Sequence, residues 1–210
     1  MLRLHDSLSS GNGFKVRLLL AQLRIPFQRI EYDIDKAETR TPAFLAKNPN
    51  GRVPTLELED GTFLPESNAI LWYLAEGTPF LPEGRRERAQ ALQWMFFEQY
   101  SHEPNIATVR FWITHRVAMT PLIELSIPAK RKNGEAALDV MEQHLAPRRF
   151  FVADRYTIAD IALYAYTHVA HECGFELGGF PQLRAWLLRI AAQPGYISMD
   201  RQTAGLAVAE

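Results

Sequence analysis

The chain begins with short apolar runs separated by turns. Leu2 and Leu4 alternate with charged residues, which predicts a short strand. The apolar positions between Phe14 and Leu23 fit a helix, and Pro26 ends it. Further elements follow: a strand over 27–34, a short helix over 42–47, strands over 55–58 and 62–64 joined by an Asp-Gly turn, and a helix over 69–74. The predicted order is β-α-β-α-β-β-α.

Strand signals stop after the turn-rich segment 77–85, which we interpret as a linker. Helices are predicted over 89–116, 123–145 and 181–192. Thr157–Asp160 has the form of a capping box in which Asp replaces the usual Glu or Gln. The fold class expected is therefore α/β plus all-α, with an α/β domain over 1–78 and an all-helical domain over 86–210.

Composition restricts the classes of function. The 210 residues are 47% hydrophobic and 22% charged, which suits a globular protein with a real core and excludes intrinsic disorder. The net charge of −1 gives no general attraction to nucleic acid or to an anionic membrane. The N-terminus lacks the apolar run of a signal peptide, and no run approaches the roughly 18 apolar residues of a membrane span. We expect a cytoplasmic protein.

Redox and metal chemistry find little support. Cys173 is the single cysteine, which excludes an internal disulfide, a CxxC pair and a four-thiolate zinc site. His168 and His171 have the i, i+3 spacing that lets two side chains share a ligand, but no third ligand is evident. No metal is expected.

Four motifs in order carry a resemblance. They are Ser9–Asn12 before the first helix, Asn48–Pro54, Glu66–Ser67 and Thr157–Asp160. Together they resemble the cytosolic glutathione S-transferase family. The resemblance is to bacterial members in which a serine or asparagine, rather than a tyrosine or cysteine, acts on the glutathione thiol. The resemblance covers nearly the whole chain. It implies a thioredoxin-like N-terminal domain that binds glutathione as co-substrate, a helical C-terminal domain and a homodimer.

The second and third motifs supply groups for glutathione, which carries two carboxylates, an ammonium group and a thiol. Glu66 and Ser67 precede a predicted helix whose free N–H groups can receive a carboxylate, while Glu66 can meet the ammonium. The alternative for Ser67 is that it only caps its own helix. Val53-Pro54 resembles the family's cis-proline turn, which would present the Val53 backbone to the tripeptide. Its alternative is a trans proline opening an edge strand. Arg52 can meet the glycine carboxylate or simply be solvated.

The loop before the first helix is the candidate for activating the thiol. The resemblance places Ser10 where serine-using members hold their hydroxyl, and Asn12 where some bacterial members use asparagine. Lowering a thiol pKa by about two units takes roughly 2.7 kcal/mol, which one hydrogen bond to the thiolate plus a helix N-terminus can supply. Ser7 and Ser9 are weaker candidates. Turn and capping chemistry is the alternative for all four.

The electrophile would lie against the helical domain. Its candidate lining is Tyr100, Phe111, Trp112 and His115, although aromatic residues at helical spacing more often form core. The leading interpretation is thiolate attack on a small apolar electrophile. Two alternatives stay open: glutathione-dependent disulfide reduction, and a non-catalytic binding or regulatory protein on the same fold.

Overall fold

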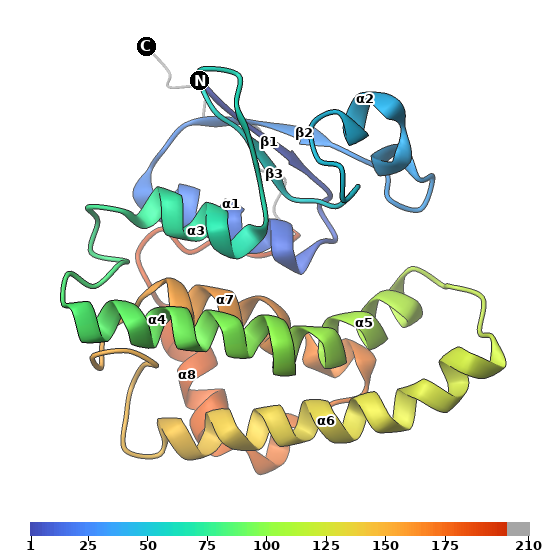
Figure 1. Cartoon of the computed structure of the whole chain (residues 1–210). Helices are drawn as coiled ribbons and strands as arrows, with labels where there is room; N and C mark the ends of the chain where they lie inside the picture. The colour runs from blue at the N-terminus through green and yellow to red at the C-terminus, as the bar shows by residue number, and fades with distance from the viewer. Residues whose placement is uncertain (201–210) are drawn as a thin grey trace. The chain divides into compact units, whose positions relative to one another are not determined.

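A computed structural model describes residues 1–200 (Figure 1). Contacts within the chain define two compact units. The first contains residues 1–78 together with the later segment 193–200, and the second contains residues 79–192. The boundaries at 78 and 86 that the sequence suggests for two domains stay a prediction, and residues 201–210 of the predicted second domain lie outside the described residues.

A four-stranded mixed sheet forms the centre of the first unit. Its strands are β1 (Leu2–Asp6), β2 (Phe27–Glu31), β3 (Thr55–Glu57) and β4 (Phe63–Pro65), in the order β2-β1-β3-β4. Strands β1 and β2 are parallel, whereas β1 with β3 and β3 with β4 are antiparallel. The helices are α1 (Gly11–Leu23), α2 (Pro42–Leu45), α3 (Ser67–Ala75) and the 3-10 turn η1 (Glu38–Arg40). The predicted element order is confirmed, except that β2 ends at Glu31 rather than at Ile34.

Helices α1 and α3 lie side by side along the sheet (Figure 1). Their apolar faces are fully buried, with Leu18 and Ile70 joining Leu4 and Leu56 of the sheet in one core. Helix α1 ends where Arg24 adopts a left-handed conformation with φ 56°, and its N–H returns to helix carbonyls. The core therefore fixes the N-terminal ends of both helices relative to the sheet.

A buried ion pair lies inside the first unit. The side chains of Asp6 and Arg17 are both fully buried and paired with each other. Arg17 also donates to the carbonyl of Leu8 over 2.9 Å and to that of Met199 over 3.2 Å. Burial raises the pKa of Asp6, while the charge of Arg17 opposes that rise. The pair thus holds the loop that follows β1 and anchors the segment 193–200.

The second unit is built from helices. They are α4 (Arg85–Phe97), α5 (Glu103–Thr114), α6 (Pro121–Leu145), α7 (Ile158–Thr167), α8 (Pro181–Ala191) and the 3-10 turns η3 (Ala170–Cys173) and η4 (Leu177–Gly179). All ten residues of α7 are buried, and α4, α5 and α8 pack against it. The predicted fold class is confirmed. None of the helices within residues 1–200 combines the length and the apolar character that a membrane span requires.

The single helix predicted over 89–116 is wrong in one respect. A π-helical segment, η2 (Glu98–His102), separates α4 from α5. Pro104 lies in the first turn of α5 and lacks the N–H that a continuous α-helix would donate four residues back. A widened turn accommodates this loss. Periodicity alone does not reveal such a turn, because the apolar pattern continues through it.

The predicted capping box at the start of α7 is confirmed. Thr157 accepts from the N–H of Ala159, and the Asp160 carboxylate accepts from the N–H of Thr157 over 2.9 Å. The same carboxylate accepts from Trp186 Nε1 over 2.9 Å and from the N–H of Phe151. Complete burial raises the pKa of Asp160 to about 6 although these hydrogen bonds oppose the rise.

Candidate functional site

The sheet topology brings the first three motifs to one edge. His5 of β1 pairs with Thr55 of β3, and Thr55 pairs with Pro65 of β4. Because these pairings are antiparallel, the end of β1, the start of β3 and the end of β4 meet. The loop before α1, the Val53-Pro54 turn and the start of α3 therefore surround the same end of the sheet, as the binding hypothesis requires.

Ser10 is the N-cap of α1. Its Oγ accepts a hydrogen bond from the N–H of Gly13 over 3.1 Å, so the capping interpretation is correct. That bond uses a lone pair of the hydroxyl and leaves its hydrogen available to another acceptor. Capping and donation to a sulfur are therefore compatible. Ser7 is buried, and its Oγ lies 3.5 Å from Ser9 Oγ.

Asn12 and Ser67 lie in direct contact. Ser67 Oγ donates to Asn12 Oδ1 over 3.2 Å. Ser67 is the first residue of α3 and not its cap, so the alternative that it caps its own helix is wrong. The contact joins the first turns of α1 and α3. Asn12, a candidate for contact with the glutathione sulfur, and Ser67, a candidate for binding a glutathione carboxylate, thus share one hydrogen-bond network.

Sequence reasoning missed Lys15 in this network. Its side chain is fully buried, and its Nζ donates to Asn12 Oδ1 over 2.7 Å and to Ser67 Oγ over 3.4 Å. A signal was available, because residues three apart share a helix face and Lys15 follows Asn12 by three. The lysine was hidden among the apolar positions of α1.

Glu66 precedes α3 in a rare backbone conformation. Its φ is 70°, a value that non-glycine residues seldom adopt, and such strain often marks functional sites. The side chain is exposed and makes no capping bond to the helix. A carboxylate is therefore presented to solvent immediately before a helix N-terminus.

The Val53-Pro54 peptide is cis, so the trans alternative is wrong. Val53 lies outside the paired part of β3, which begins at Thr55, and its backbone stays outside the ladder. Asn48 Nδ2 donates to the carbonyl of Arg52 over 2.8 Å and to Thr55 Oγ1 over 3.1 Å. This amide holds both ends of the turn. The Arg52 side chain is exposed beside it.

The electrostatics of this edge favour anions. The first turns of α1 and α3 contain no acidic residue, so neither helix N-terminus is neutralised by its own first turn. Unpaired N–H groups and the positive ends of the helix dipoles attract negative groups. Lys15 adds a cation between them. The site can therefore receive a carboxylate or stabilise a thiolate.

Other candidates lie in the second unit. Tyr100 is 87% exposed, and Phe111 is exposed and stacks on His115 with ring centroids 4.5 Å apart. Neither Tyr100 nor Phe111 is core. Lys130 Nζ lies 5.9 Å from the ring centroid of Trp112.

The cysteine and the histidine pair do not form a reactive cluster. Burial raises the pKa of the Cys173 thiol to about 11, which keeps it protonated near neutral pH. His168 Nδ1 lies 2.9 Å from the carbonyl of Tyr164, while His171 is exposed. Among residues 1–200, no group of three or more His, Cys, Asp or Glu side chains is placed to hold a metal ion.

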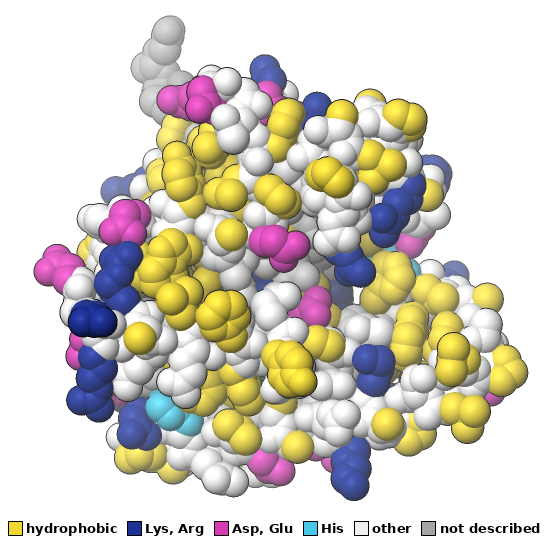
Figure 2. All heavy atoms as spheres, viewed as in Figure 1, with side chains coloured by type: hydrophobic (Ala, Val, Ile, Leu, Met, Phe, Trp, Pro, Cys, Tyr) yellow, Lys and Arg dark blue, Asp and Glu magenta, His cyan; other side chains and the backbone are white. Residues whose placement is uncertain are grey.

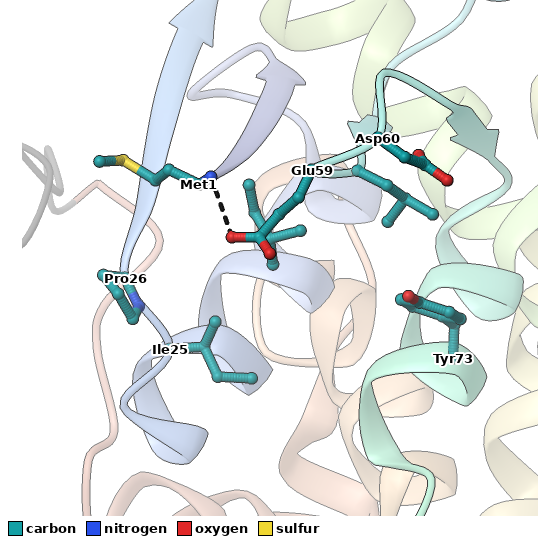
Figure 3. Close-up of a pocket in the computed structure, with 8 residues that line it drawn as sticks. Met1, Ile25, Pro26, Glu59, Asp60 and Tyr73 are labelled. Atoms are coloured by element: carbon teal, nitrogen blue, oxygen red, sulfur yellow. Dashed lines mark ion pairs between the residues drawn. The ribbon is translucent and has the colours of Figure 1, made fainter.

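A separate hollow lies at the opposite end of the sheet in the first unit (Figure 3). It has a volume of about 650 Å3 and is lined by Met1, Leu2, Ile25, Pro26, Leu58, Glu59, Asp60 and Tyr73. The terminal amine of Met1 forms an ion pair with Glu59 over 2.9 Å, drawn as a dashed line in Figure 3. None of the predicted site residues lines this hollow, so the binding hypothesis does not involve it.

Comparisons with known proteins agree with this geometry. The family profile "Glutathione S-transferase, N-terminal domain" matches residues 9–76, and the corresponding C-terminal domain profile matches residues 124–189. A possible glutathione S-transferase from Rhodopseudomonas palustris is 51% identical with a TM-score of 0.92, over 95% of this chain and 98% of that chain.

Two further relatives are more distant. The glutathione S-transferase-like protein LUC7 of a Fusarium species is 33% identical, over 89% of this chain and 87% of its own length. A structure of Ure2p in complex with glutathione is 27% identical with a TM-score of 0.84, over 92% of this chain and 90% of that chain. A thioredoxin-like unit, a helical unit and these matches lead to one conclusion: the chain belongs to the glutathione S-transferase family.

Proposed function

We propose that this protein is a glutathione transferase that uses Ser10 and Asn12 to stabilise the glutathione thiolate for attack on a small apolar electrophile. In the reaction, the thiol proton is lost to solvent, the sulfur forms a bond to an electrophilic carbon, and the leaving group departs with its electron pair. The observation that carries the proposal is the meeting of Ser10, Asn12 and Ser67 at one anion-attracting edge of the sheet.

The binding roles follow from the chemistry of each group. The N–H groups that open α3 receive the γ-glutamyl carboxylate, and the exposed Glu66 meets the adjacent ammonium. The backbone of Val53, held outside the ladder by the cis Pro54, pairs with the middle residue of the tripeptide as an added strand would. Arg52 meets the glycine carboxylate. The structure of Ure2p with glutathione supports this ligand class.

Activation of the thiol needs donors and no general base. The Ser10 hydroxyl retains its hydrogen, and the Asn12 amide oxygen accepts from Lys15 and Ser67, so Nδ2 is the end of this amide that can donate to the sulfur. A hydrogen bond to a charged sulfur contributes about 1.5–3 kcal/mol. Together with the N-terminus of α1, this supplies the roughly 2.7 kcal/mol that a shift of two pKa units requires.

The proposal is tested by binding and by turnover. Calorimetric titration with glutathione should show binding, and the complex should convert a chromogenic aryl halide faster than free glutathione does. Turnover of a mixed disulfide instead would favour the disulfide reductase, in which the glutathione sulfur acts alone because Cys173 is buried. Binding without either turnover would favour a regulatory protein. No heat and no retention on immobilised glutathione would reject the site itself.

A second copy of this chain is the partner that we propose. Exposed apolar side chains follow one stretch of the second unit, with Phe96 68% exposed and Leu92, Tyr100 and Val140 also exposed. A hollow of about 340 Å3 lies beside them, between η2 and α6, and is lined in part by Tyr100 and Val140. Figure 2 shows hydrophobic side chains, in yellow, exposed over the helices of the second unit. Exposed apolar surface marks protein interfaces. Light scattering should give twice 24.0 kDa, and a particle of 24.0 kDa would reject the dimer.

A further inference from the structure

A buried lysine connects the two helix ends that form the proposed site. Lys15 lies one turn after Asn12 on α1, and its side chain is fully buried. Lysine is seldom buried completely, because its ammonium group must be matched by acceptors. Two of its acceptors are Asn12 Oδ1 at 2.7 Å and Ser67 Oγ at 3.4 Å. These belong to the two residues that the proposed function assigns to the sulfur and to the γ-glutamyl carboxylate.

These contacts settle which way the Asn12 amide faces. Lys15 can only donate hydrogen bonds, so the end of the amide that it contacts is the oxygen. The Ser67 hydroxyl donates to the same oxygen over 3.2 Å. Nδ2, with its two N–H donors, therefore points away from Lys15 and Ser67. A rotated amide would place N–H against the lysine ammonium, donor against donor.

We propose that Lys15 is a positioning residue for glutathione activation: it holds the Asn12 amide with Nδ2 directed to the sulfur. This role rests on the proposed function. Within it, Lys15 is the group that makes Asn12 present a donor, rather than an acceptor, to the glutathione sulfur. A thiolate accepts hydrogen bonds, so a rotated Asn12 would repel it. Lys15 acts through Asn12, and its own contact with the sulfur is not required.

Two neutral variants separate this role from a simple effect of charge. K15Q keeps an N–H donor on a side chain of comparable length, whereas K15M has no donor. The other charged side chains at this edge, Asp6, Arg17, Glu31, Arg52 and Glu66 among them, are identical in both variants. Any difference between K15Q and K15M therefore reports the hydrogen bond. K36M, which removes an exposed lysine paired with Asp33 in the same unit, is the matched control.

The measurement is ultraviolet titration of the glutathione thiolate in the complex. We expect K15M to raise the pKa of the bound thiol by about one unit, a tenfold loss of thiolate below that pKa, and K15Q to raise it by under about half a unit. In the N12A background, K15M should add less than about 0.3 unit, because the residue through which it acts is gone. K36M should titrate like the parent.

The failures can be told apart. If the parent protein binds no glutathione, the proposed function fails before Lys15 is tested. If the parent binds and K15M titrates like the parent, the positioning role is wrong while the function stands. Equal shifts in K15M and K15Q that persist in the N12A background would show a direct effect of charge and would overturn the role through Asn12. Circular dichroism of each variant confirms the fold, and K15A, which also lacks a donor, takes the place of K15M if K15M does not fold.

Discussion

The Ser67 hydroxyl donates to Asn12 Oδ1 over 3.2 Å and so joins the first turn of α3 to that of α1. The bond changes what each residue can offer a ligand. Because the Ser67 hydrogen is engaged, the carboxylate receptor that we propose at α3 consists of backbone N–H groups. A substitution of Asn12 should therefore also change the binding of the carboxylate, and a substitution of Ser67 should also change the pKa of the bound thiol.

The first prediction concerns the donor to the sulfur. S10A removes a hydroxyl whose hydrogen is available, and N12A removes the oriented amide. We expect the more important of the two to raise the pKa of bound glutathione by about one to two units. Ultraviolet titration of the complex measures the shift. Should both single variants titrate like the parent, neither residue is the donor. S126A, on α6 in the second unit, is the control.

The second prediction concerns Ser67. S67A removes its hydrogen bond to Asn12 but keeps the backbone N–H groups of α3. We expect glutathione to bind about three- to tenfold more weakly, with a smaller loss of kcat, because a net hydrogen bond is worth about 1 kcal/mol. Calorimetry and steady-state kinetics give the two values. Unchanged affinity would contradict a role for Ser67 at the receptor, and S126A, at a half-buried position on α6 of the second unit, serves as the control.

The third prediction concerns Gly13 in the first turn of α1. Alanine is a better helix former than glycine by about 1 kcal/mol, yet a Cβ at this position would overlap Asp6 Oδ1. We expect G13A to destabilise the protein by about 1–3 kcal/mol in urea unfolding. G178A, at a site where a Cβ meets nothing within 4 Å, should change stability by less than about 0.5 kcal/mol. A stabilised G13A would show that the Asp6 carboxylate does not occupy this position.

The fourth prediction concerns pH. Burial raises the pKa of Asp160 from 3.8 to about 6, so between these values the folded state binds more protons than the unfolded state. The contribution of the protonated carboxyl to the free energy of unfolding is fully present below pH 3.8 and is lost as the pH rises through about 6. The loss amounts to about 3 kcal/mol at most. Urea unfolding at several pH values measures it.

Two variants test whether Asp160 causes this pH dependence of the unfolding free energy. D160N should flatten the slope between pH 4 and 6, whereas D139N, at an exposed position on α6, should leave the slope unchanged. A slope equal to that of the parent in D160N would show that another group is responsible.

The sequence predicted most of the fold because the first unit follows simple patterns. Alternating strands, the Asp-Gly hairpin and the Thr157 box each depend on neighbouring residues, and each was found in place. The π-helical turn at Glu98–His102 was missed, because helical periodicity reports which face is buried and not the local width of the helix.

The site was predicted as separate motifs rather than as a network. Ser10, Val53 and Glu66 were found at one end of the sheet because strand order places them there. The contacts of Asn12 and Lys15 with Ser67 were missed, because they join residues more than 50 positions apart. The contact between Asn12 and Lys15 was missed although the two residues are three apart on one helix. The positive φ of Glu66 was missed as well, since glutamate carries no sequence signal for it.

The anchoring of Met199 by Arg17 has a consequence for biosynthesis. Residues 193–200 belong to the first unit although the whole second unit is translated before them. On the ribosome, the sheet and its helices can assemble early, but the Arg17 side chain acquires the Met199 carbonyl as a partner only after residues 193–200 emerge. The first unit is thus completed after the second unit has been made.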